Sequence, residues 1–424
     1  MPVRLSELVA VGRVTYAGAV TTSSAPAADR VDSGFRFPWL ITACAGLIVL
    51  GVIPILFSCN PLPTIIFFSD HPASRMAGRA ILVLLVFLII AGIARIDSAP
   101  RPEKIRRYGG FILLAGFLTG YHYFAVDLAH LGWQIEQYNR VLRHTYVAPD
   151  QYRFLPQGIL WWMLLGNADF VFALLAYRFL FTFLLCQAIF QFARLYLAPR
   201  ESVFIVLLYA VFYPLSTRYY YGNMLDPMSH AVMLAALTCC QRQQFPQFFW
   251  LIVLGMFIKE TMLLIIPCYY LMNRETMWWR DARVLARLAL VVLVAAAVFL
   301  ACRIPFHFDY NFETLNRTSE LMIYSNLGLS GAKHWSSVSV FERYLHPILF
   351  IFVWLPLIIW RRKLLPAPLF RTALYLAAAF YLTNLCFGWN YESRNFVPPL
   401  IVLLVCTLMV ANRPGLSNNP AGAS

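Results

Sequence analysis

The stretch Tyr121–Pro156, YHYFAVDLAHLGWQIEQYNRVLRHTYVAPDQYRFLP, decides how the rest of the chain is interpreted. It follows the apolar run Phe111–Val126 and precedes another hydrophobic region, yet it is filled with charged, histidine and aromatic side chains. Its apolar residues recur at the spacing of one helical face, at Leu131, Ile135, Tyr138 and Leu142. This pattern favours an amphipathic segment that lies on a membrane. A solvated loop without a specific role is the alternative.

The composition is that of a membrane protein. Of 424 residues, 60% are hydrophobic and only 13% are charged, and long apolar runs recur along the sequence. We expect an all-α, polytopic transmembrane protein with about 12 hydrophobic passes. The net charge of +14 does not indicate nucleic acid, because the basic residues are dispersed among apolar runs and set the orientation in the membrane.

Cysteine and histidine give no sign of a metal centre. The nine cysteines lie mostly inside apolar runs and include no CxxC pair, so we expect small core residues. No HExxH or comparable histidine spacing is present, so the sequence does not indicate a metal; the cofactor stays unknown, and a divalent cation stays open as an alternative. The lack of a P-loop and of a GxSxG elbow argues against ATP-driven transport and serine hydrolase chemistry.

Three parts of the chain are expected. Residues 1–37 contain the polar tract TTSSAPAADR and lack the pattern of a signal peptide, so they predict a disordered cytoplasmic tail. Residues 38–411 form a transmembrane catalytic domain with long outer loops at about 127–167 and 303–345, the first of which carries amphipathic helices. Residues 412–424 are a second disordered cytoplasmic tail.

Basic links set the expected topology. The links at 95–107, 274–283 and 361–363 are rich in Lys and Arg and are therefore predicted to be cytoplasmic, as are both termini. The segment 154–167 is expected as a helix on the outer face. The expected spans lie near 38–57, 80–95, 109–126, 168–194, 202–215, 227–240, 284–302, 346–360, 366–387 and 396–411.

The segment Phe248–Met272 has two interpretations. As a single span it would put Lys259 and Glu260 near the bilayer centre, at a cost of roughly 2.5–3.5 kcal/mol for each charge. Two short half-helices with these residues at an outer turn avoid that cost and keep the basic cluster 361–363 in the cytoplasm. We therefore favour the half-helices.

The candidate site residues share one predicted location, the outer ends of spans. Ionisable groups at that level are costly and usually pair with another charge or contact substrate. They are Asp127, Arg153, Arg218, Asp226, Lys259, Glu260, Glu392 and Arg394. Structural alternatives are an internal Lys259–Glu260 salt bridge, an interfacial Glu392–Arg394 pair, and a helix cap at Asp226.

The layout resembles the GT-C superfamily of membrane glycosyltransferases, bacterial type. A span ends in Asp127, and a long loop leads to the surface segment QYRFLPQGILWWMLL. A span with Arg178, the turn YYYGNMLDP, the charged Lys259–Glu260 break and the late segment ESRNFVPPLIVLL follow in order. The resemblance covers most of residues 109–411. Two spans precede it, and no second acidic residue stands beside Asp127.

The resemblance implies transfer of a sugar from a polyprenyl-phosphate-linked donor to a glycan, lipid or protein acceptor. It places the enzyme in a bacterial inner membrane, with an inverting reaction on the periplasmic face during cell-envelope assembly. Asp127 would be the general base for the acceptor hydroxyl. Lys259, Arg218 and Arg394 would bind the departing lipid phosphate, and the other candidates would contact substrate.

Two other classes stay open. Broken helices also occur in secondary transporters and lipid flippases, although the two halves of this chain have no evident similarity. Polysaccharide polymerases and ligases are likewise polytopic with large outer loops.

Overall fold

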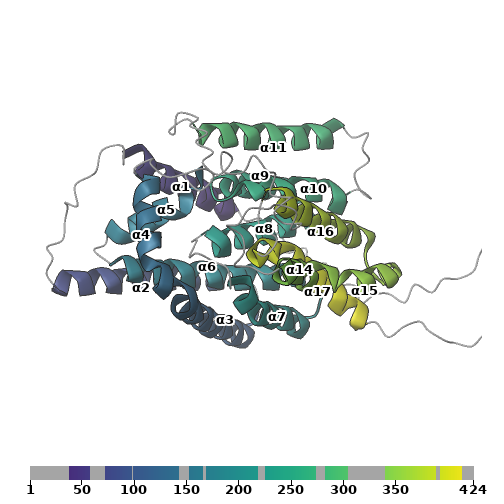
Figure 1. The fold of residues 1–424 in the computed structure, drawn as a ribbon, viewed down its shortest axis with the longest axis horizontal. Helices are drawn as coiled ribbons and strands as arrows, with labels where there is room; N and C mark the ends of the chain where they lie inside the picture. Colours follow the sequence, from purple (N-terminus) through teal and green to yellow (C-terminus); the bar gives the residue numbers. More distant parts are fainter. Residues whose placement is uncertain are drawn as a thin grey trace, which may run out of the picture. The chain divides into compact units, whose positions relative to one another are not determined.

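The computed structural model describes nine ranges of the chain: 38–57, 72–97, 99–142, 152–165, 169–217, 225–273, 282–303, 340–387 and 392–412. The described residues from Trp39 onward form one compact unit, and every regular element among them is a helix (Figure 1). The two expected tails lie outside these ranges, except for Asn412. Because all regular elements of the described residues are helices, the predicted all-α class is confirmed.

Six helices are long and apolar enough to cross a membrane within the described residues. They are Arg75–Ile96, Arg101–Leu142, Phe170–Ala193, Val284–Ala301, Ala367–Cys386 and Ser393–Ala411. The other apolar segments do not meet these requirements of length and apolar composition together, so the expected number of passes is not reproduced among the described residues.

Among the six candidate spans, α2 (Pro72–Ile96) and α11 (Ala282–Ala301) have the smallest share of buried side chains. Leu84 and Leu88 of α2 are 58% and 56% exposed, and Leu293 of α11 is 68% exposed. Apolar side chains left uncovered along a whole helix indicate contact with lipid.

The interior is built on α6 (Phe170–Ala193), α8 (Leu225–Gln241) and α17 (Val397–Ala411). Nearly all side chains of α8 and α17 are buried, and α6 packs most extensively against α8. Asp169 caps α6, since its Oδ1 accepts a 2.8 Å hydrogen bond from the Phe172 amide. α3 (Arg101–His122) and α7 (Pro199–Thr217) also pack against α6.

The helix that carries Asp127 does not end there. α3 continues through a π-helical turn, η1 (Tyr123–Asp127), into α4 (Leu128–Leu142), so the first part of the expected loop 127–167 is helical. Neither proline nor a Gly-rich stretch interrupts these residues, so nothing in the sequence stops the helix. The wider π turn shifts the helical register, and Asp127 becomes completely buried.

Helix α5 (Leu155–Leu165) docks on α1 (Pro38–Phe57) rather than lying free on a surface. The Leu50 carbonyl would normally accept from the amide of residue 54, but residue 54 is proline and has no N–H. The Trp162 indole takes that place and donates to Leu50 O at 2.7 Å. The helices also meet at Gly158, where a Cβ atom would lie 2.6 Å from Gly51 O, so only glycine fits.

The segment 248–272 is a helical hairpin. α9 (Phe245–Met256) ends before Lys259, whose backbone is extended, and η3 (Glu260–Ile265) leads into α10 (Ile266–Asn273). The Tyr269 ring stacks on Phe248 at 5.0 Å, and Asn273 Nδ2 donates to Cys240 O at 3.0 Å. The end of α10 therefore returns to the start of α9, which confirms the two half-helices.

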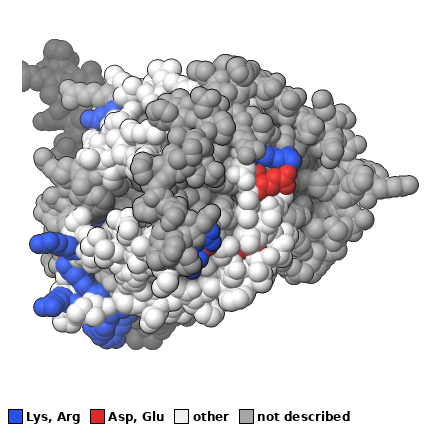
Figure 2. All heavy atoms as spheres, turned by 90° about the vertical axis from the view of Figure 1, so that its left-hand side faces the viewer, with Lys and Arg blue, Asp and Glu red and all other residues white. Residues whose placement is uncertain are grey.

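The chain closes with α14 (Val340–Pro347), η6 (Ile348–Phe352), α15 (Leu355–Trp360), η7 (Arg362–Leu364), α16 (Ala367–Phe387) and η8 (Ser393–Phe396), which leads into α17. Most of the second expected loop, 304–339, lies outside the described residues, and helix resumes at Val340 rather than after 345. Figure 2 shows Lys and Arg side chains gathered at one edge of the face it presents. Arg95, Arg101 and Arg106 of the first basic link are exposed.

Candidate functional site

The first of two buried polar groups, here called the Asp226 group, comprises Asp226, Lys259, Glu392 and Arg394. One carboxylate holds both cations: Asp226 Oδ1 lies 3.2 Å from Lys259 Nζ, and Asp226 Oδ2 lies 3.1 Å from Arg394 Nη1. Arg394 Nη2 binds Glu392 Oε2, also at 3.1 Å. Charges removed from water in this way are retained only with such compensation.

Helix ends bring the Asp226 group together. Asp226 stands in the first turn of α8, Lys259 in the hairpin break, and Arg394 in the short helix η8 before α17. An exposed helix cap at Asp226 would explain its position in α8, but not its burial between two cations. Burial lowers the pKa of the Lys259 ammonium from its ordinary value, while Asp226 opposes that shift.

Asn395 completes the network around Lys259. Its Oδ1 accepts from Lys259 Nζ at 2.7 Å, while its Nδ2 donates to Asn384 Oδ1 at 2.9 Å and to Glu392 Oε2 at 3.3 Å. Nothing in the sequence distinguished this asparagine from its neighbours, because its role depends on the approach of α16 and of the hairpin.

Glu260 has a different partner from Lys259. Arg153 binds it with two nitrogens, and the Nε–Oε2 contact measures 2.9 Å. The extended backbone at Lys259 sends the two neighbouring side chains in different directions. An internal Lys259–Glu260 salt bridge is therefore wrong. Burial alone would raise the pKa of the Glu260 carboxyl, but the Arg153 guanidinium outweighs it and lowers the pKa to about 2.

The second group, here called the Asp127 group, comprises Asp127, Arg178, Gln134 and His122. Arg178 Nη2 and Gln134 Nε2 each donate to Asp127 Oδ1 at 2.7 Å, and His122 Nε2 lies 3.6 Å from the same oxygen. Asp127 is 0% exposed and Arg178 is 1% exposed. Asp127 Oδ2 has no hydrogen-bond partner among the described residues.

His122 links the Asp127 group to α7. Its Nδ1 lies 2.9 Å from the Tyr213 hydroxyl, and the backbone carbonyl of Tyr213 accepts from Ser216 Oγ at 2.7 Å and from Thr217 Oγ1 at 3.2 Å. Ser and Thr hydroxyls commonly donate in this way to a carbonyl three or four residues earlier in a helix.

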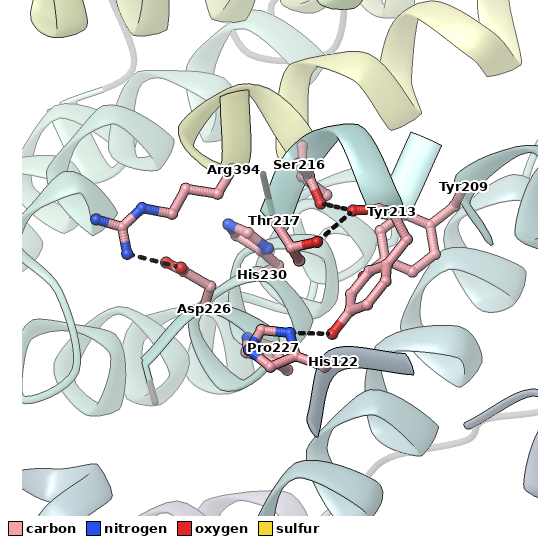
Figure 3. Close-up of a pocket in the computed structure, with 10 residues that line it drawn as sticks. His122, Tyr209, Tyr213, Ser216, Thr217, Asp226, Pro227, His230 and Arg394 are labelled. Atoms are coloured by element: carbon pink, nitrogen blue, oxygen red, sulfur yellow. Dashed lines mark hydrogen bonds and ion pairs between the residues drawn. The ribbon is translucent and has the colours of Figure 1, made fainter. Parts of the chain in front are cut away.

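Both groups border one small cavity (Figure 3). Its polar lining includes His122, Tyr213, Asp226, His230 and Arg394. Figure 3 shows the His122–Tyr213 pair on one side and the Asp226–Arg394 pair on the other. The cavity has a volume of about 20 Å³, which is room for a water molecule and too little for a sugar ring.

The predicted residues thus fall into three places. Asp226, Lys259, Glu392 and Arg394 form one network, and Arg153 with Glu260 forms a pair at the same hairpin break. Asp127 belongs to the second network, whereas Arg218 lies outside the described residues.

Four residues of these networks are not among the site residues predicted from the sequence: His122, Gln134, Tyr213 and Asn395. A usable signal existed for His122, which stands five residues before Asp127 on an uninterrupted helix, so that the π turn brings both to one side. Tyr213 gave no comparable signal.

No three His, Cys, Asp or Glu side chains come together as a metal site in the described part of the chain. Comparisons with protein-family models, with curated proteins and with solved structures find no match to this chain.

Proposed function

We propose that the protein is a membrane glycosyltransferase of the GT-C type, which transfers a sugar from a polyprenyl-phosphate-linked donor to an acceptor hydroxyl. In this proposal the chain makes about 12 passes, counting short and broken helices, with the site near the outer face of the inner membrane. The acceptor is a glycan, a lipid or a protein.

One observation carries the proposal: the buried network that holds the Asp127 carboxylate and the buried network that holds Lys259 and Arg394 border the same cavity. Asp127 reaches the cavity through His122, while Arg394 and Asp226 line it directly. Glycosyl transfer needs both kinds of group, because a hydroxyl loses a proton while a phosphate leaves with its negative charge.

The cations suit the leaving phosphate. Lys259 and Arg394 bind the two oxygens of one carboxylate, a spacing that two oxygens of a phosphate can also satisfy. Binding of the donor would therefore compete with Asp226 for these two side chains. Arg153 lies at the same break and is compensated by Glu260.

The carboxylate suits the base. Asp127 is held by Arg178 and Gln134 through Oδ1 alone, which leaves Oδ2 able to accept a proton. Glu136, the nearest other carboxylate in sequence, is exposed and paired with Arg140 on the surface of α4. A solvated carboxylate is a poorer candidate for a positioned base.

The test is consumption of a lipid-linked sugar. Purified protein is incubated with a series of radiolabelled polyprenyl-phosphate sugars, and release of the lipid phosphate is measured. We expect release by the parent protein and a loss of about 10²–10⁴-fold in Asp127→Asn, which is nearly isosteric. The control Glu136→Gln is expected to keep the parental rate. Equal rates in Asp127→Asn and the parent would remove Asp127 from the mechanism.

The hairpin favours one alternative function, a secondary transporter or lipid flippase. Substrate sites in transporters are also formed by discontinuous helices, as in this hairpin with its break at Lys259. A carrier would move the lipid-linked sugar across vesicles without cleaving it, so transport of labelled donor without release of lipid phosphate would support this alternative.

A further inference from the structure

We propose that the proton leaves the acceptor hydroxyl through a relay of Tyr213 and His122 that ends at Asp127. The inference rests on the proposed glycosyl transfer and adds the route between the cavity and a carboxylate that does not line it. Three side chains from two helices, α7 and α3 with its π turn, form this route.

The relay begins in the cavity. Tyr213 and His122 both line it, whereas Asp127 does not, although Asp127 is in contact with His122. The cavity holds a hydroxyl but not a sugar ring, so the relay requires that donor binding, which draws Lys259 and Arg394 away from Asp226, widens it. An acceptor hydroxyl there meets Tyr213 and has no direct path to Asp127. Figure 3 shows the Tyr213 hydroxyl directed at the His122 ring.

The two contacts of His122 require one tautomer for the relay to work. Nδ1 must accept from the Tyr213 hydroxyl at 2.9 Å, and Nε2 must carry the proton that faces Asp127 Oδ1 at 3.6 Å. The second distance is longer than a hydrogen bond, and such contacts commonly tighten when substrate binds.

The proton balance is closed. As the acceptor oxygen attacks the anomeric carbon, its proton passes to the Tyr213 oxygen, and the Tyr213 proton passes to His122 Nδ1. The Nε2 proton of His122 passes to the Asp127 carboxylate. Tyr213 and His122 end neutral, Asp127 ends protonated, and the sugar–phosphate bond breaks with its electron pair on the lipid phosphate.

Asp127 is built to receive this proton. Arg178 and Gln134 fix the carboxylate through Oδ1, and Oδ2 has no hydrogen-bond partner among the described residues. Since a buried acceptor without a partner costs free energy, a carboxylate kept in this state is suited to taking up a proton during the reaction.

The first arm of the test does not depend on turnover. Protein labelled with ¹⁵N-histidine is studied by NMR, and the His122 signals are identified as those missing in His122→Gln. We expect the Nε2–H tautomer of neutral His122. The Nδ1–H tautomer would overturn the relay, because Nε2 would then have no proton to give to Asp127.

The second arm measures transfer kinetics. Tyr213→Phe is expected to lower kcat by about 10²-fold without raising KM for the lipid-linked sugar. Tyr138→Phe is the matched control, because Tyr138 is also a buried tyrosine, packs on Phe170 with ring centroids 5.5 Å apart, and does not line the cavity. It should retain the parental kcat.

A double variant separates a relay from a purely structural role. Tyr213→Phe combined with Asp127→Asn should lose no more activity than the worse single variant, since members of one proton path act as a unit. Additive losses, or a parental kcat in Tyr213→Phe, would overturn the relay. A parent protein that releases no lipid phosphate would instead refute the proposed function, while the tautomer measurement would still decide the relay geometry.

Discussion

Replacing Lys259 with methionine tests the partners assigned at the hairpin break. Lys259 and Asp226 are 7% and 6% exposed, and their nearest charged atoms are 3.2 Å apart. Removing one partner of a buried ion pair costs about 3–5 kcal/mol because the other charge loses its compensation. Asp226 still keeps Arg394 at 3.1 Å, so we expect a loss near the lower limit, about 3 kcal/mol of unfolding free energy.

Two double variants distinguish the partners of Lys259. Lys259→Met with Asp226→Asn removes both charges and leaves Arg394 bound to Glu392, so about half of the lost stability should return. Lys259→Met with Glu260→Gln should recover nothing, because Glu260 binds elsewhere. The free energies are measured by titrating SDS into mixed detergent micelles. Recovery in the Glu260 double variant and none in the Asp226 double variant would refute the assignment.

The other predictions concern helix docking, pH and topology. Gly158→Ala is expected to lose about 1–3 kcal/mol of stability, because its Cβ would lie 2.6 Å from a backbone oxygen of α1; thermal unfolding in detergent measures this. Glu260 stabilises the fold fully above pH 4.5, so the stability difference between the parent and Glu260→Gln should vanish as the pH falls toward about 2. Single cysteines at Ser98 and Lys363 should both resist an impermeant thiol reagent in intact cells.

A control variant or a contradicting result tests each of these three predictions. Gly116→Ala is the control for the docking variant, since the nearest atom to its Cβ would be a Phe179 ring carbon at 3.9 Å. A difference between the parent and Glu260→Gln that persists at low pH would contradict the paired carboxylate. Labelling at Lys363 but not at Ser98 would place the two basic links on opposite sides of the membrane.

The hairpin was predictable because its signal is local and strong. Adjacent Lys259 and Glu260 in the middle of an apolar run leave few arrangements that a bilayer tolerates, and a break is the least costly. Most helix bounds follow from apolar runs in the same way. The partner of Lys259 was not predictable, since it depends on the backbone direction at one extended residue and on helix ends far away in sequence.

The surroundings of Asp127 show the opposite case. The polar residues after it suggested the start of a loop, but they belong to a continuing helix. Glu136 and Arg140 are exposed on it, whereas Gln134 is buried and binds Asp127. A single π turn orients the carboxylate toward Arg178 instead of water. The five residues of this turn contain no distinctive motif, so the turn could not be predicted from the sequence. The buried pair could be suspected from Arg178 within an apolar span, but its geometry could not.

The hairpin also constrains how the protein is made. α9 and α10 have 12 and 8 residues, so neither can cross a bilayer core of roughly 30 Å alone, and the two must enter the membrane together. Asp226 has already been synthesised by then, and it can neutralise Lys259 at once. Arg394 and Asn395 emerge from the ribosome only near the end of translation. A chain cut short before η8 would therefore leave this charge network incomplete, and its stability would report whether synthesis had been finished.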